Sequence, residues 1–170
     1  DGAGRVDRRG GPAGAGAKTG RGPRSSMHNL YEVRIAWGDC DPAGIVFYPN
    51  YFAWFNAATD TLFARAGLSL EEAMARHGIL GWPMVDAHAS FRMSSRFGEI
   101  LRIESHLHAF RHSSFEVHHR ACKADGTLAV EARDIRVWAA GEAGRLRGQR
   151  VPDEVRELFV RGRDEGSKQA

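Results

Sequence analysis

The strongest indication of the fold is WGDCDPAGIVFYPNY, residues 37–51, which continues into FAWFNAATDTLFARAG, residues 52–67. It places two carboxylates, Asp39 and Asp41, in a segment punctuated by Gly and Pro, between a strand-like pattern and a helix-like one. Backbone N–H groups at the start of a helix are unpaired and carry the positive end of the helix dipole, so they bind an anion or a polarised carbonyl oxygen. A carboxylate beside such a helix start predicts an active site.

Residues 49–66 have the pattern of a buried helix. Apolar side chains recur at helical spacing and form an unusually wide face: Tyr51, Phe52, Trp54, Phe55, Ala58, Leu62, Phe63 and Ala66. Gly67 then has the position typical of a helix C-cap. A helix that is apolar over so much of its circumference is typical of a protein interior, so we expect the rest of the chain to wrap around it.

Strand patterns flank this helix on both sides. Before it, residues 30–37 alternate between apolar and polar side chains. After it comes a short helical segment at residues 70–78. Four segments of period two follow, which predict strands at residues 85–93, 101–109, 114–123 and 128–139. Residues 124–126 predict a hairpin turn, and residues 152–160 predict a last short helix. One strand, a long buried helix and four antiparallel strands describe a hotdog fold. This is an α+β architecture in which an antiparallel sheet of about five strands wraps around a central helix.

Residues 1–26 differ in composition from the rest of the chain. They are rich in Gly, Ala and Arg, and six basic residues against two aspartates give them a net charge of +4. Because the whole chain carries +3, residues 27–170 carry −1, which removes most of the electrostatic case for binding nucleic acid. We interpret residues 1–26 as a disordered extension, with Met27 as a candidate native start, residues 27–163 as one domain and residues 164–170 as a polar tail.

The sequence carries no pattern typical of export or membrane insertion. It has neither the apolar segment of a secretory signal nor a run of about 18 apolar residues. Cys40 and Cys122 form no CxxC motif and too small a set for a disulfide framework. We therefore predict a cytoplasmic protein that has no membrane partner.

The run GDCDPAGIVFYPNY before an aromatic-rich helix closely resembles the hotdog thioesterases of the 4-hydroxybenzoyl-CoA thioesterase type, the branch that uses an aspartate in the turn. The likeness continues at residues 89–91, 111–115 and 136–140 and covers about residues 28–152. The resemblance implies hydrolysis of an acyl-CoA thioester to a free acid and CoA, with no metal or redox cofactor. It also implies a homodimer or homotetramer with active sites between protomers.

The resemblance assigns roles to residues of the turn. Asp41 matches the catalytic carboxylate, as nucleophile or general base, and the Tyr48 backbone N–H matches the group that polarises the thioester carbonyl. The turn between them matches the segment that contacts the substrate, Gly44, Ile45, Val46 and Phe47. Asp39 suits a structural role in the turn, and Cys40 has no accompanying His or Asn pattern that would make it a nucleophile.

Several departures from the family concern the substrate, among them the absence of the family's tryptophan shortly after the helix, where residues 67–72 read GLSLEE. Asn56 stands where the hydroxybenzoyl enzymes carry an aspartate that holds the ring hydroxyl, and an amide supplies no negative charge. The family's cluster of basic residues for the CoA phosphates is reduced to Arg111, His112 and Ser113, among which Arg111 is the expected phosphate ligand and Ser113 a further substrate contact. We expect an aryl or medium-sized acyl group.

Two other functions stay open at this level. One is a hotdog hydratase or dehydratase, although its D-x-x-x-x-H order is not evident around Asp41. The other is a non-catalytic module that binds acyl-CoA, against which the presence of Asp41 argues. Five histidines raise the question of a metal, but we interpret them as solvated sheet residues or interface packing and predict no metal site: His106, His108, His112, His118 and His119.

Overall fold

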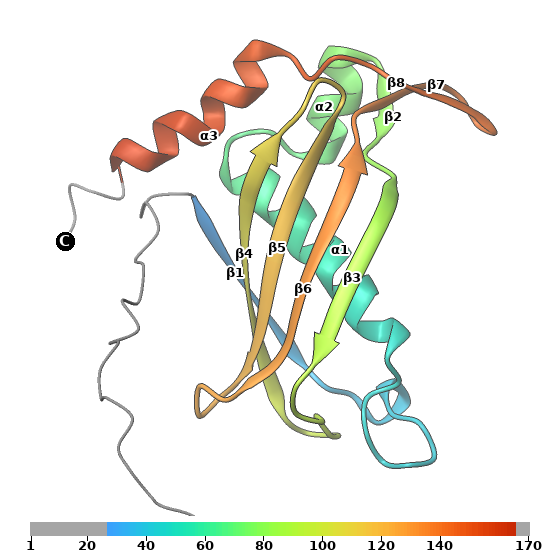
Figure 1. Cartoon of the computed structure of the whole chain (residues 1–170), viewed down its shortest axis with the longest axis vertical. Coiled ribbons are helices and arrows are strands. Elements are labelled where there is room, and N and C mark those ends of the chain that lie inside the picture. The colour runs from blue at the N-terminus through green and yellow to red at the C-terminus, as the bar shows by residue number, and fades with distance from the viewer. Residues whose placement is uncertain (1–26, 166–170) are drawn as a thin grey trace, which may run out of the picture.

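The computed structural model describes residues 27–165 of the chain (Figure 1). The main strands are β1 His28–Arg34, β3 Met84–Phe91, β4 Ile100–Phe110, β5 Ser114–Lys123 and β6 Leu128–Val137. They form an antiparallel sheet in the order β1-β4-β5-β6-β3, and the long helix α1, Pro49–Arg65, lies across one face of it. The predicted α+β hotdog arrangement is confirmed. The predicted extension, residues 1–26, and most of the predicted tail lie outside the described residues.

A small second sheet is absent from the sequence prediction. It consists of β2 Ile79–Gly81, β7 Ala139–Glu142 and β8 Arg145–Gly148, in the order β2-β7-β8. The predicted single strand over residues 128–139 is therefore wrong at its end, because β6 stops at Val137 and β7 belongs to the other sheet. The break occurs at Trp138, whose ring is buried and whose backbone N–H donates to the Ser113 oxygen at 2.9 Å.

Two shorter helices have the predicted positions. Helix α2, Leu70–His77, begins with a capping box, in which the Ser69 hydroxyl accepts from the Glu72 N–H at 3.2 Å and the Glu72 carboxylate accepts from the Ser69 N–H at 2.9 Å. It ends at Gly78, whose φ of 64° suits glycine. Helix α3, Asp153–Glu165, is longer than the predicted segment and packs Val155 and Phe159 into the core.

The first strand ends earlier than its alternating pattern predicts. Residues 30–37 alternate, yet β1 stops at Arg34 and a short 3₁₀ turn, Trp37–Asp39, follows, leaving Trp37 80% exposed. The reason is a local hydrogen bond, which the Asp39 carboxylate accepts from the Ala36 N–H at 2.7 Å. This bond turns the chain before the alternating pattern of residues 30–37 ends.

Strand β3 departs from the prediction in its burial. The alternation predicts one apolar face in the core, but Val85 is 62% exposed and Phe91 is 51% exposed. β3 is an edge strand of the main sheet and pairs only with β6 among the described strands, so in the single chain little packs against it.

Helix α1 buries one face rather than its whole circumference. Its buried residues are Tyr51, Phe55, Ala58, Thr59, Leu62 and Phe63. Ala53, Asn56 and Ala64 are exposed, so the expectation that the chain encloses the helix is wrong for the single chain. The sheet covers one side of α1, and nothing in residues 27–165 covers the other side to the same degree.

The core beneath α1 divides into two apolar clusters. The first surrounds the start of the helix and contains Tyr51, Phe55, Leu101 and Ile103. The second surrounds its end and consists mainly of aromatic residues, among them Phe63, Trp82, Phe115, Trp138 and Phe159. Each large side chain buried here contributes about 1.5–3 kcal/mol to folding. Between the two clusters lies a layer of buried polar residues, described below.

Within residues 27–165, no helix combines the length and the apolarity needed to cross a bilayer.

Candidate active site

The turn between β1 and α1 holds its two aspartates differently. Asp39 is built into the backbone of the turn, because its carboxylate accepts from Ala36 and its backbone oxygen accepts from the Phe47 N–H at 2.8 Å. Asp41 Oδ1 accepts only a local bond, from the Ala43 N–H at 2.8 Å. No described residue donates to the other Asp41 carboxylate oxygen. Asp41 is therefore the carboxylate that is available for chemistry.

A tight loop fixes the position of Asp41. The Asp41 N–H donates to the Ile45 oxygen at 2.9 Å, the Gly44 N–H donates to the Asp41 oxygen at 2.9 Å, and Cys40 and Val46 form a β-bridge. Gly44 has a φ of 75°, a conformation that L side chains rarely adopt. The loop consequently places Asp41 directly across from Ile45.

The start of α1 presents an unpaired donor close to this loop. Pro49 is the first helical residue and has no N–H, and the N–H groups of Asn50 and Tyr51 donate to the oxygens of Phe47 and Tyr48. Among the described residues, no acceptor is recorded for the Tyr48 backbone N–H. A donor of this kind at a helix N-terminus can polarise a carbonyl oxygen.

A hollow of about 250 Å³ opens beside the helix start. Ile45, Val46 and Tyr48 line it from the turn, and Phe91 and Ser95 line it from the end of β3 and the segment that follows. Gly44 and Phe47 belong to the turn but not to this lining. The Ser95 side chain is only 1% exposed, and its hydroxyl lies close enough to Tyr51 to affect the pKa of that group but makes no hydrogen bond of good geometry with a described residue. A ligand atom that pairs with this hydroxyl would satisfy a buried polar group.

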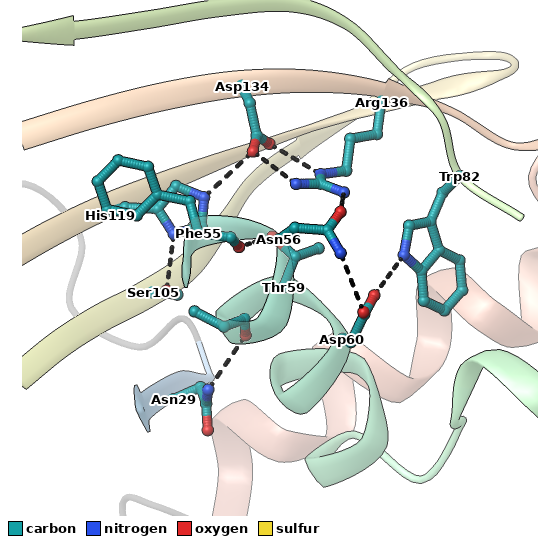
Figure 2. Close-up of polar contacts among 11 residues, drawn as sticks. Asn29, Phe55, Asn56, Thr59, Asp60, Trp82, Ser105, His119, Asp134 and Arg136 are labelled. Carbon is teal, nitrogen blue, oxygen red and sulfur yellow. Dashed lines mark hydrogen bonds and ion pairs between the residues drawn. The ribbon is translucent and has the colours of Figure 1, made fainter. Parts of the chain in front are cut away.

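Figure 2 shows the contacts within the layer of polar side chains. The Ser105 hydroxyl lies 2.7 Å from His119 Nδ1, and His119 Nε2 lies 3.4 Å from the Asp134 carboxylate. Arg136 donates to both oxygens of Asp134, at 3.2 and 2.9 Å. These four side chains come from the inward faces of β4, β5 and β6, and each is nearly inaccessible to solvent.

Burial sets the charge states in this layer. Burial lowers the pKa of His119, and this effect outweighs the neighbouring Asp134, which raises it. The ring is therefore neutral near pH 7. A neutral ring then accepts at Nδ1 from Ser105 and donates from Nε2 to Asp134. Burial alone would raise the pKa of Asp134, but the hydrogen bonds from His119 and Arg136 outweigh it, and the pKa is lowered overall. Asp134 and Arg136 therefore form a buried ion pair.

The polar layer reaches the exposed face of α1 through Asn56. Arg136 Nη1 donates to Asn56 Oδ1 at 2.6 Å, and Asn56 Nδ2 donates to Asp60 at 3.3 Å (Figure 2). Asp60 also accepts from Trp82 Nε1 at 2.8 Å. Asn56, Asp60 and Trp82 line a second hollow of about 280 Å³, with Leu70, Leu80 and Leu146 among its apolar walls.

Arg111 and Ser113 lie far from Asp41 within one chain. The turn that holds Asp41 adjoins the beginning of β4, since the Ile35 N–H donates to the Glu99 oxygen at 2.9 Å. Arg111 follows the end of the same strand (Figure 1). With 11 residues, β4 spans about 35 Å. One chain therefore brings the turn residues and Tyr48 together, places Asn56 in a second hollow, and holds Arg111 and Ser113 at the opposite end of the sheet.

A family model described as the thioesterase-like superfamily matches residues 35–159. The chain belongs to this superfamily. The thioesterase is similar to the 4-hydroxybenzoyl-CoA thioesterase of Pseudomonas sp. (strain CBS-3), with 38% identity over 132 residues, which is 75% of this chain and 94% of the relative. The predicted hotdog thioesterase, a hydrolase, is confirmed.

Solved structures agree with this assignment. The crystal structure of the Pseudomonas enzyme matches with a TM-score of 0.73 and 36% identity, over 78% of this chain and 99% of that one. A gentisyl-coenzyme A thioesterase matches with a TM-score of 0.67 and 31% identity, over 75% of this chain and 98% of that one.

The histidines of the thioesterase divide into groups. His119 is buried in the polar layer and stacks on Phe55 with ring centroids 4.8 Å apart, so its interpretation as a solvated or interface residue is wrong. His112 is exposed at the β4–β5 turn. His106, His108 and His118 lie close together on the other face of the sheet. Burial, together with the neighbouring histidine rings, lowers the pKa of His106 to about 4.

The sequence prediction misses Asp134 and Arg136 as residues of the site. The sequence does contain a signal for them in residues 130–138. Side chains alternate between the two faces of a strand, and the inward-facing positions of this segment include Val130, Asp134, Arg136 and Trp138. Opposite charges two residues apart on an inward face indicate a buried ion pair. Ser95 follows the end of a strand and carries no comparable sequence signal.

Proposed function

We propose that this thioesterase hydrolyses an aryl- or medium-acyl-CoA thioester to the free acid and CoA. Asp41 acts as nucleophile or general base, and the Tyr48 backbone N–H polarises the thioester carbonyl. The observation that carries the proposal is the turn itself, which sets an available carboxylate across from Ile45, at the edge of the hollow that Tyr48 lines. A variant of 4-hydroxybenzoyl-CoA thioesterase with one aspartate replaced by asparagine has been crystallised with 4-hydroxybenzoyl-CoA, which supports a test on an aspartate here.

Either route leads to the same products. As a base, Asp41 takes a proton from water while the water oxygen adds to the carbonyl carbon. As a nucleophile, its carboxylate adds to that carbon and forms an anhydride, which water then hydrolyses. In both routes negative charge develops on the carbonyl oxygen next to the Tyr48 N–H. The C–S bond breaks when the tetrahedral adduct collapses, which gives the free acid in the base route and the anhydride in the nucleophile route, and CoA leaves as a thiolate that takes up a proton.

We assign the acyl group to the second hollow. Its apolar walls suit an aryl or medium-length chain, and Asn56 and Asp60 supply polar atoms on one face of α1. The Asp60 carboxylate, one helical turn after Asn56, brings a negative charge to the wall of this hollow. This location lies on the helix face that the sheet of the same chain does not cover.

We further propose a homodimer or homotetramer in which Arg111 and Ser113 of one copy bind the substrate on which Asp41 of another copy acts. Strand β4, about 35 Å long, keeps Arg111 and Asp41 at opposite ends of the sheet within one chain. If the β3 edges of two copies pair antiparallel, Arg111 of one copy comes to the end of the sheet that holds Asp41 of the other. The exposed Val85 and Phe91 of β3 support contact at this edge.

The test compares the wild-type chain with Asp41→Asn over a panel of aryl- and alkyl-CoA esters, with thiol release as the readout. Asparagine keeps an oxygen that can accept from the Ala43 N–H, so the turn should survive. We expect kcat to fall by about 10²–10⁴-fold. Asp39→Asn, two residues away, is the matched control and should retain most of the activity. If wild type and Asp41→Asn are equally inactive on every ester, the proposed hydrolysis of aryl- and alkyl-CoA esters is wrong, and if both are equally active, Asp41 is not the catalytic group.

We also propose the cytoplasm as the compartment of this enzyme. Cys40 and Cys122 are free thiols, which supports a reducing environment. Cell fractionation with an antibody to the chain tests this proposal.

A further inference from the structure

Three histidines converge on the face of the main sheet that points away from α1. His106 and His108 belong to β4, and His118 of β5 lies directly opposite His106 in the register. The alternate positions of the two strands, including Leu107 and Val117, are buried on the α1 side. The three imidazoles therefore project from the outer face, separate from the hollows that the proposed hydrolysis uses.

A β-bulge brings the third histidine into the group. Leu107 pairs with Val117 and Ala109 pairs with Glu116, so His108 is the extra residue on β4. A bulge redirects the side chain of the extra residue. Here it lays the His108 ring on the His118 ring, with centroids 4.2 Å apart and planes 8° from parallel. The His106 ring lies 5.3 Å from that of His118, and one nitrogen from each of the three residues falls within 4.8 Å of the others.

A carboxylate supports this group from behind. Glu116 Oε1 lies 2.8 Å from His118 Nε2, which directs the other ring nitrogen of His118 to another partner. Histidines that bind metals usually make such a bond with their second nitrogen, because it orients the ring and increases the basicity of the ligand. Arg133, which lies opposite His118 on β6, is paired with Asp86 at 3.4 Å.

We propose that His106, His108 and His118 bind a divalent transition-metal ion, with Zn²⁺ as the first candidate. Imidazole nitrogen suits Zn²⁺, Cu²⁺ and Ni²⁺, whereas Mg²⁺ and Ca²⁺ require oxygen ligands. Three protein ligands leave a fourth tetrahedral position for water or another small ligand. The ion joins β4 to β5 on the outer face and stabilises the sheet. It is not a cofactor of the proposed hydrolysis.

The full chain, stripped of metal with a chelator and then dialysed, is titrated with Co²⁺ and Zn²⁺. We expect one Co²⁺ per chain, with the visible absorption typical of tetrahedral coordination, and its displacement by Zn²⁺. Zn²⁺ should also raise the unfolding temperature, because an ion that binds only the folded state stabilises it. Glu116→Gln should weaken binding by about 10–100-fold.

The variants His108→Gln and His118→Gln should abolish the Co²⁺ spectrum and the shift in unfolding temperature. His88→Gln is the control, since His88 is exposed on β3 of the same sheet and outside the group. His108 is exposed, so its replacement tests the proposal even if His118→Gln fails to fold. The absence of saturable binding, or binding that survives both replacements, would overturn the proposal. Neither outcome depends on whether the chain hydrolyses thioesters.

Discussion

Arg136 Nη1 donates a 2.6 Å hydrogen bond to Asn56 Oδ1 and thereby joins the buried polar layer of the sheet to the exposed face of α1. Arg136 is 1% exposed and is itself held by Asp134. The orientation of the Asn56 amide follows from this contact, because its oxygen faces the guanidinium and its nitrogen faces Asp60. Asn56, a wall residue of the proposed acyl pocket, is thus oriented by a buried ion pair that does not itself line the pocket.

Replacing Arg136 by Met should destabilise the fold. The change keeps the side-chain volume but leaves the Asp134 carboxylate without its buried partner, and such losses cost about 3–5 kcal/mol. Urea unfolding of wild type and variant measures the difference in the free energy of unfolding. Arg133→Met is the control, because Arg133 lies on the outer face in an exposed pair with Asp86 and should cost at most about 1 kcal/mol.

A double replacement sharpens this prediction. With Asp134→Leu added to Arg136→Met, no unpaired charge remains in the core, so the double variant should be more stable than Arg136→Met alone. Equal or additive destabilisation would contradict the role of the buried charge.

Replacing Asn56 by Asp should change the choice of acyl group. A carboxylate at this position forms an ion pair with Arg136 and accepts a hydrogen bond from a ring hydroxyl more strongly than an amide does. The ratio of kcat/KM for 4-hydroxybenzoyl-CoA to kcat/KM for benzoyl-CoA should rise about tenfold. Asp60→Asn, which removes a charge from the same hollow, should lower this ratio. An unchanged ratio in both variants would place the acyl group elsewhere.

Replacing Ser95 by Ala tests whether the Ser95 hydroxyl binds the substrate or stabilises the fold. The Ser95 hydroxyl is buried and makes no hydrogen bond of good geometry with a described residue, so its removal should change the free energy of unfolding by no more than about 0.5 kcal/mol. If the hydroxyl bonds to the substrate in the hollow beside Tyr48, kcat/KM should fall about tenfold. Ser94→Ala, at an exposed neighbouring position, is the control. A stability loss of several kcal/mol with unchanged kinetics would reverse this interpretation.

Replacing Arg111 by Ala should raise KM for CoA esters about tenfold and leave kcat nearly unchanged. The reason is that a phosphate contact remote from the reacting carbon stabilises the ground state and the transition state equally. Arg111 is also 3.7 Å from Glu116; the arginine is largely exposed, so this long contact adds little to stability. Arg145→Ala, at another exposed arginine, is the control.

Mixed oligomers test whether Arg111 acts on a neighbouring copy. Arg111→Ala chains carry Asp41, and Asp41→Asn chains carry Arg111. When the two are unfolded and refolded together, a site shared between copies should recover a population with the wild-type KM. If both residues act within one chain, mixing restores no such site.

Much of the fold follows from local signals in the sequence. Pro49 and Gly67 mark the ends of α1, and the Ser69 and Glu72 capping box marks the start of α2. The turn from Asp39 to Tyr48 is equally local, because its hydrogen bonds join residues close in sequence. For this reason the structural role of Asp39 is predictable from the sequence and fits its hydrogen bonds in the turn, whereas the catalytic role of Asp41 stays a prediction.

The sequence predictions fail where contacts between residues distant in sequence determine the structure. The alternating pattern of residues 128–139 continues through Trp138, but the buried ring and its bond to Ser113 end the strand. The exposure of β3 depends on its position at the edge of the sheet, which periodicity does not encode.

The hotdog architecture, the turn and the helix start are predictable from the sequence, because turn and helix propensities and hydrophobic period act over a few residues. The orientation of Asn56 by Arg136, the bulge that lays His108 on His118, and the separation of Arg111 from Asp41 by β4 arise only in the folded chain. These relationships depend on the order and register of the strands. Both result from long-range packing of the whole sheet against α1, which no short segment specifies.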